Sequence, residues 1–119
     1  MKQIIYGDIV SKSNNYRIIK TSGHASLRKS DAAEEYEKKF YLQCSLRNAN
    51  ISGHFELYID AYFSSNRKDL DNCLKIILDC LQSCGAISND RNCVKITAQK
   101  FVDKKNPRIE FEIKEIKNL

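Results

Sequence analysis

Residues 54–63 constrain the fold more than any other stretch of the chain, because their apolar and polar side chains alternate without a break. The apolar set is Phe55, Leu57, Ile59, Ala61 and Phe63, and the intervening set is His54, Glu56, Tyr58, Asp60 and Tyr62. A period of two predicts a β-strand with one buried face and one open face. Other elements of the fold must therefore cover the apolar side of this strand.

A helix is predicted directly after this strand, from about residue 69 to residue 84, and Gly85 is suited to end it. At 100° per residue, its core stripe consists of Leu70, Leu74, Ile77, Leu81 and Cys84. Cys73, Ile76 and Cys80 widen the apolar arc beyond what a surface helix needs. The excess either packs on another helix or forms a dimer interface, and both interpretations stay open.

The remaining segments complete a single α+β domain of 119 residues. Strands are expected at 2–10, 93–102 and 108–116, and a first helix is expected to begin near Ser30 or Asp31. The apolar stripe of that helix is Ala33, Tyr36, Phe40 and Cys44. Residues 11–29 are rich in Ser, Asn, Gly and Lys and are expected to form an irregular basic arm. The predicted order is β-α-β-α-β-β, a mixed sheet with two helices packed on one face.

The charge distribution favours a polyanionic partner. The formal net charge is +5, and residues 1–29 hold six Lys or Arg against the single acid Asp8. Residues 95–119 hold seven basic residues against four acids, whereas most acids lie between residues 31 and 90. A basic periphery around an acidic centre suits nucleic acid held at its flanks. An ordinary solvated surface is the alternative.

Membrane and secretory classes are disfavoured. No apolar run reaches the roughly 18 residues of a membrane span, and the first residues lack a signal-peptide profile. The five cysteines show no C-x-x-C pair, which predicts reduced thiols in a cytoplasmic protein rather than disulfides or a zinc site. No P-loop or Gly-rich dinucleotide turn is present, so no small-molecule cofactor is expected.

The start of the second helix carries the residues most suited to chemistry. Asp69 as N-cap and Asp71 in the first turn gather two carboxylates at the positive end of the helix dipole, and Lys75 shares the face of Asp71. Asp90 follows after the turn at Gly85. Carboxylates bind a hard divalent cation such as Mg²⁺. The alternative is structural: Asp69 only caps the helix, Asp71 complements the dipole, and Lys75 pairs with Asp71 or with Asp79.

Three segments resemble the RusA family of Holliday junction resolvases, small endonucleases often carried by prophages. Residues 68–75 (KDLDNCLK) resemble the family's D-L-D-N-x-x-K core. Residues 13–17 (SNNYR) resemble its S-N-N element, and residues 85–90 (GAISND) resemble the short turn that ends in its third acid. The chain departs from the family in two places. It has Ser11-Lys12-Ser13 where the family usually has prolines, and it has only Arg67-Lys68 before the first Asp, where the family can have a longer basic run.

The resemblance implies a homodimer that makes paired, symmetric nicks in a four-way DNA junction with Mg²⁺, for which Mn²⁺ can substitute. It implies that the metal-binding acids are Asp69, Asp71 and Asp90, and that Lys75 is the basic catalytic residue. Contacts to DNA phosphates are expected from Arg17, Arg67 and Lys68. Asn14 and Asn15 either bond to the DNA backbone or form a turn.

Two other functions remain open. The first is a non-catalytic DNA-binding module whose aspartates only stabilise a helix. The second is a metal-dependent nuclease that cuts flaps or replication forks instead of four-way junctions. Tyr16, Tyr58 and Tyr62 either stack on the bases of an opened junction or pack within the protein.

Overall fold

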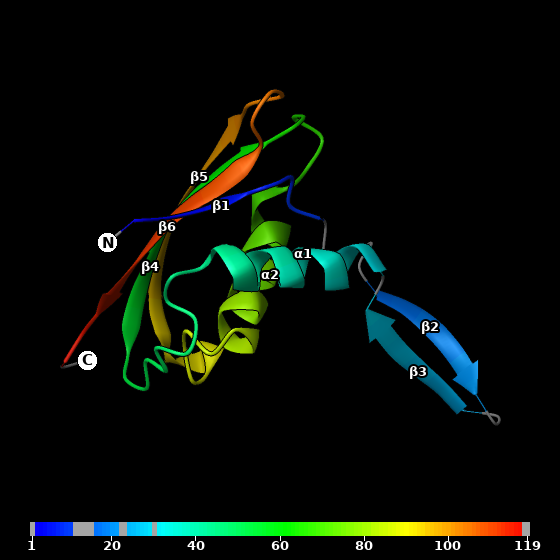
Figure 1. The fold of residues 1–119 in the computed structure, drawn as a ribbon, viewed down its shortest axis with the longest axis horizontal. Coiled ribbons are helices and arrows are strands. Elements are labelled where there is room, and N and C mark those ends of the chain that lie inside the picture. The colour runs from blue at the N-terminus through cyan, green and yellow to red at the C-terminus, as the bar shows by residue number, and fades with distance from the viewer. Residues whose placement is uncertain (1, 11–15, 22–23, 30, 118–119) are drawn as a thin grey trace.

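The computed structural model describes residues 2–10, 16–21, 24–29 and 31–117, and it confirms the α+β class. A four-stranded mixed sheet has the strand order β1-β6-β4-β5, and two helices lie on one face of it (Figure 1). The elements of this body are β1 (Gln3–Tyr6), α1 (Asp31–Gln43), β4 (Phe55–Phe63), α2 (Leu70–Ser83), a short 3-10 helix η2 (Asp90–Asn92), β5 (Cys93–Val102) and β6 (Arg108–Glu115). No helix in the described part is both long and apolar enough to cross a membrane.

Strand β4 is the organising element of the sheet. It pairs antiparallel with β6 and parallel with β5, and the parallel pair is joined through α2 as a β-α-β crossover. Its predicted apolar set is buried at every position, and its other side chains are only partly covered. The prediction of a half-buried strand over residues 54–63 is confirmed, with the first residue trimmed.

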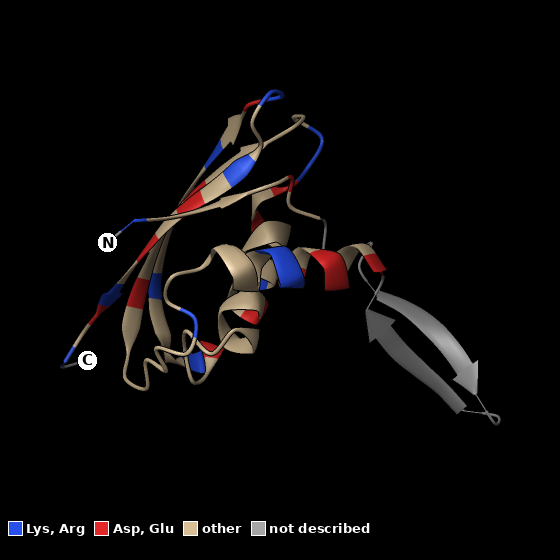
Figure 2. Cartoon of the chain, in the orientation of Figure 1, with Lys and Arg blue, Asp and Glu red and all other residues tan. Residues whose placement is uncertain are grey.

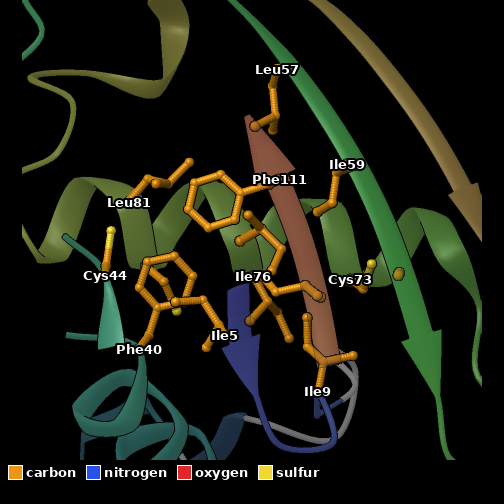
Figure 3. Packing of buried hydrophobic residues seen from close by; sticks show 14 of the residues in the cluster. Ile5, Ile9, Phe40, Cys44, Leu57, Ile59, Cys73, Ile76, Leu81 and Phe111 are labelled. Carbon is orange, nitrogen blue, oxygen red and sulfur yellow. The ribbon is translucent and has the colours of Figure 1, made fainter. Parts of the chain in front are cut away.

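The core lies between this sheet and the two helices (Figure 3). The predicted stripe of α1 is buried, and Phe40 from that helix stacks on Phe111 of β6 with ring centroids 5.8 Å apart. All five cysteines lie among the described residues, and they are free thiols. Four of them are buried, as expected for small apolar side chains in a reduced core.

The apolar stripe of α2 is rotated relative to the prediction. Cys73, Ile76 and Cys80 are at most 8% exposed and belong to the chain's own core, whereas Leu70 and Leu74 are only partly buried at its margin. The helix packs against the sheet and also contacts α1, so two neighbours bury a wider arc than one. This flank is therefore not an open dimer interface.

The expectation of an irregular arm over residues 11–29 is wrong for most of its length. Residues 16–21 form β2 (Tyr16–Thr21) and residues 24–29 form β3 (His24–Lys29), an antiparallel pair that makes a separate two-stranded sheet (Figure 1). Ile, Thr and Tyr favour extended backbone, and the two strands are separated in sequence by Ser22-Gly23, a turn-forming pair. Residues 11–15 lie outside the described part of the chain.

Strand β1 is shorter than predicted, because the chain leaves the sheet after Tyr6. Gly7 has φ of +118°, a backbone conformation that side-chain-bearing residues rarely adopt. The N–H of Gly7 donates to the carbonyl of Pro107 at 2.9 Å, which closes the edge of the sheet. Residues 8–10 then run as non-strand backbone toward the β2–β3 hairpin.

Candidate active site

Two of the predicted acids lie at the exposed first turn of α2. Asp69 is the N-cap residue, as predicted, but its carboxylate makes no capping hydrogen bond to the helix backbone. Asn72 contacts both acids instead: its backbone N–H donates to Asp71 Oδ1 at 2.9 Å, and its side-chain Nδ2 donates to Asp69 Oδ2 at 3.4 Å. Both carboxylates are exposed to solvent at the positive end of the helix dipole.

The third predicted acid is held by the predicted catalytic lysine. The ammonium of Lys75 donates to Asp90 Oδ2 at 2.8 Å and lies 3.4 Å from Asp79 Oδ1. The hydrogen bond from Lys75 lowers the pKa of Asp90 below its ordinary value, and the same hydrogen bond raises the pKa of Lys75. Both groups are therefore charged at neutral pH. The alternative that these residues have only structural roles is confirmed in one respect, because Lys75 forms an ion pair with Asp79.

A glycine cap on α2 sends the chain toward Asp90. Gly85 has φ of +76°, and its N–H donates to the carbonyl of Gln82 while the N–H of Ala86 donates to that of Leu81. This pair of bonds is the Schellman motif, which confirms the prediction that Gly85 ends the helix. A side chain at Gly85 would also meet Asn48, whose Oδ1 would be 3.2 Å from the added Cβ.

The turn after Gly85 is fixed by residues 48–51, a predicted turn that was not among the predicted site residues. Four main-chain hydrogen bonds join the two segments: Asn48 N–H to Cys84 O, Asn50 N–H to Gly85 O, Ile51 N–H to Ala86 O and Ser88 N–H to Ile51 O. Beyond this ladder, the N–H of Asp90 donates to Gln82 Oε1 at 2.9 Å. Gln82 lies seven residues after Lys75, on the same side of α2, so one ridge of the helix binds Asp90 through both its backbone and its carboxylate.

The predicted DNA-contacting residues are distributed over three places. Arg67 is exposed in the loop before α2. Lys68 is engaged within the protein, since its ammonium lies 2.9 Å from Asp8 Oδ2 and donates to the carbonyl of Ile9 at 2.6 Å. Arg17 lies on β2 directly opposite Arg28 of β3. Asn14 and Asn15 lie outside the described residues, so both interpretations of them stay open.

The outer face of the sheet is occupied by packed aromatic rings and mixed charges. Tyr62 stacks on Phe101 with centroids 4.7 Å apart, and the guanidinium of Arg108 lies 3.8 Å from the centroid of the Tyr62 ring. The ring of Tyr62 therefore packs within the protein, which was one of the two interpretations of this residue. Acidic and basic residues are interspersed along the sheet strands in Figure 2, so this face is not a uniformly basic surface.

The three acids are not gathered into one cluster. Within residues 2–10, 16–21, 24–29 and 31–117, the structure contains no group of three or more His, Cys, Asp or Glu side chains that could hold a metal ion as they stand. Asp69 and Asp71 both lie at the N-terminal end of α2, whereas the carboxylate of Asp90 accepts a hydrogen bond from Lys75. The chemistry of the set nevertheless fits a hard cation, because exposed carboxylates supply only oxygen ligands.

Two residues of this site were missed as functional candidates. Asn72 stands inside the D-L-D-N string, so its position in the motif was the available signal. Gln82 could have been found from its spacing of seven from Lys75, which places both on one helical face. The 48–51 ladder had no such signal, because it depends on backbone hydrogen bonds between distant segments.

An exposed helix end with two acids and a charged lysine, in a domain that also carries a segment rich in Lys and Arg, suits a polyanionic partner. The family model of the endodeoxyribonuclease RusA matches residues 7–114, which is most of the 119-residue chain. The chain therefore belongs to the RusA endodeoxyribonuclease family, and the predicted resemblance is confirmed. Membership makes it a nuclease of the Holliday junction resolvase type. No curated protein matches the chain.

Proposed function

We propose that this protein hydrolyses phosphodiester bonds in four-way DNA junctions with the help of Mg²⁺, and that Asp69, Asp71 and Asp90 hold the metal. The observation that carries the proposal is the meeting of Lys75 and Asp90 at 2.8 Å beside the first turn of α2. These residues come from separate elements, and an ordinary surface ion pair contributes little to stability. Lys75 also follows the exposed Asp71 by four residues on the same helical face, an arrangement that is better suited to a reacting phosphate.

The protein residues have distinct roles in this mechanism. When bound, Mg²⁺ polarises the scissile phosphate and lowers the pKa of an attacking water. The carboxylates of Asp69, Asp71 and Asp90 supply its oxygen ligands. Lys75 stays protonated and neutralises negative charge that develops on the phosphate or the leaving oxygen. Asp79 helps to hold Lys75 in place through its contact at 3.4 Å.

A panel of DNA substrates separates this function from its alternatives. Linear duplex, flap, fork and four-way DNAs of matched sequence are incubated with the wild-type protein in Mg²⁺. Preferential cutting of the four-way junction is expected. Equal or faster cutting of flaps or forks would indicate the second alternative, and binding without any cutting would indicate the DNA-binding module.

The basic hairpin is proposed to hold the DNA backbone. The segment 16–29 contains Arg17, Lys20, Arg28 and Lys29 and no acid, and Arg17 pairs in register with Arg28. Phosphate contacts of this kind release counterions, so junction affinity should fall steeply as salt rises. Arg67 adds a further exposed cation next to the acids.

The Arg17→Ala variant should bind the junction less tightly and with a shallower salt dependence. The slope of log affinity against log salt should decrease in magnitude by about 1, the value for one lost phosphate contact. Fluorescence anisotropy across a salt series measures it, with the exposed Lys38→Ala on α1 as a control that should leave the slope unchanged. A salt-insensitive affinity for the wild type would remove the electrostatic role of the hairpin.

We also propose a homodimer, because paired symmetric nicks need two active sites related by a twofold axis. Strand β5 is the longer edge of the four-stranded sheet, with β4 on one side only. Ile96 faces the same way as the fully buried Leu57 but is 41% exposed, and Val94 and Val102 are exposed on the same strand. An apolar unpaired edge of this length is a template for pairing with a second copy.

The Ile96→Lys variant should therefore shift the protein from dimer to monomer in sedimentation at micromolar concentration. A lysine on an edge strand opposes pairing with another edge through its charge. The matched control is Leu42→Lys on α1, which changes another exposed apolar residue, 74% exposed, and should leave the dimer intact. A monomeric wild-type protein that still cleaves junctions would contradict the dimer.

A further inference from the structure

Asp8 forms a polar cluster with the loop that leads into α2, and the mechanism above leaves this cluster without a role. Its carboxylate accepts hydrogen bonds from the hydroxyl and the backbone N–H of Ser64, the latter at 3.2 Å, and lies 2.9 Å from the ammonium of Lys68. Burial raises the pKa of Asp8, but hydrogen bonds from Ser64 and Lys68 outweigh it, so the pKa lies below its ordinary value. Asp8, Ser64 and Lys68 are called the Asp8 cluster below.

The Asp8 cluster fixes both ends of the loop between β4 and α2. Ser64 is the first residue after β4, and Lys68 is the last residue before the N-cap Asp69. Lys68 also donates to the carbonyl of Ile9 at 2.6 Å, so its ammonium is held by two groups of residues 8–9. In the middle of the loop, the ammonium of Lys100 donates to the carbonyl of Asn66 at 3.0 Å.

The position of Asp69 depends on this anchoring, because the helix itself holds the carboxylate of Asp69 only weakly, through a long contact of 3.4 Å from Asn72 Nδ2. Its backbone is extended, with φ of −92° and ψ of 135°, and its carboxylate makes no capping bond. The direction in which the loop enters α2 therefore sets where the carboxylate of Asp69 lies. Misplacement of a reacting group by about 1 Å can cost about a hundredfold in rate.

We infer that Asp8 is a positioning residue, which holds the 64–69 loop through Ser64 and Lys68 so that Asp69 is placed for metal binding. The inference rests on the proposed function, since it assigns Asp8 to the same metal site. It also gives Lys68 a role inside the protein that precedes any contact with DNA. Asp8 lies 60 residues from Lys68 in the sequence, and its hydrogen bonds are with Ser64 and Lys68 rather than with the proposed metal ligands.

The test compares Asp8→Asn with Glu110→Gln in metal binding and in cleavage. Asparagine keeps the shape of Asp8 but loses the charge that holds Lys68, whereas Glu110→Gln removes an ion pair with Arg108 and Lys2 on the sheet. Asp8→Asn should weaken Mn²⁺ binding, measured by titration calorimetry without DNA, by about tenfold. The Mg²⁺ concentration for half-maximal cleavage should rise in parallel, junction affinity in EDTA should stay unchanged, and Glu110→Gln should match the wild type throughout.

Three further variants complete the test. Ser64→Ala keeps the Asp8–Lys68 ion pair and should shift the Mn²⁺ affinity in the same direction by a smaller factor, which keeps the test open if Asp8→Asn folds poorly. In a Lys68→Met background, Asp8→Asn should have a smaller effect than in the wild type, because only the contacts with Ser64 remain to be changed. Asp71→Asn, measured alongside, reports on the metal site itself.

Failure of the positioning role of Asp8 and failure of the metal site would give different results. If Asp71→Asn abolishes Mn²⁺ binding while Asp8→Asn and Ser64→Ala bind like Glu110→Gln, the positioning role of Asp8 is overturned and the metal site stands. If Asp71→Asn binds Mn²⁺ like the wild type, the metal site is overturned, and the role of Asp8 is overturned with it.

Discussion

Replacing Asp71 with Asn is expected to lower the rate of junction cleavage by at least about 10²- to 10³-fold in saturating Mg²⁺, and Asp90→Asn is expected to do the same. Each change keeps the shape of the side chain and removes one negative charge, so the metal is lost or misplaced. Single-turnover cleavage of a labelled four-way junction measures the loss.

Junction binding by the same variants should survive or become tighter. A carboxylate that faces phosphates without its metal is repulsive, and its removal relieves that repulsion. The fold should persist, because Asp71 is exposed in the first turn of α2 and Asp90 lies in the short helix η2. A purely structural role for these acids predicts a stability cost of about 1 kcal/mol and no separation of binding from cutting. Asn variants that cut at the wild-type rate would refute the metal-site assignment.

Lys75→Gln should reduce the cleavage rate by about 10²- to 10³-fold with little change in junction affinity, because its charge acts on the developing transition state. The comparison variant is Asp79→Asn, which breaks the weaker of the two contacts of Lys75, at 3.4 Å, and leaves that with Asp90 at 2.8 Å. Asp79→Asn should retain most of the activity. If the two variants lost activity equally, Lys75 would be acting through the ion-pair network rather than on the phosphate.

The parts of the fold that local pattern could predict are those in which one segment determines its own structure. The alternation over residues 54–63 predicted β4, and Gly85 predicted the end of α2, because side-chain period and left-handed backbone are local properties. The β2–β3 hairpin was missed because residues 11–29 were read by their overall polar composition. The shorter extended runs on either side of Ser22-Gly23 were the better signal.

The burial of α2 shows that a local pattern does not predict which face of a helix is covered by its neighbours. Cys73, Ile76 and Cys80 were assigned to a flank of the helix, yet they lie in the core because both the sheet and α1 contact this helix. Helical periodicity gives the width of an apolar arc but not the direction in which each neighbour lies. The proposed dimer surface is therefore the edge strand β5, because this flank is buried within the chain's own core.

The candidate site likewise has one part that the sequence could predict and another part that it could not. Asp71 and Lys75 lie on one helix and Asp69 is its N-cap residue, so the proximity of the three could be predicted from spacing alone. The arrival of Asp90 at Lys75 depends on the bonds to residues 48–51 and to Gln82, and the anchoring of Lys68 depends on Asp8. These contacts join segments far apart in sequence, and no periodicity within a single segment encodes them.

The most direct test of the proposed mechanism is single-turnover cleavage across an Mg²⁺ titration, using a four-way junction labelled on two opposing strands. We predict no product in EDTA, a saturable rise in rate with Mg²⁺, and nicks at symmetric positions on both labelled strands. Cleavage at the same rate in EDTA would contradict the metal-dependent mechanism, and nicks confined to one strand would contradict paired resolution.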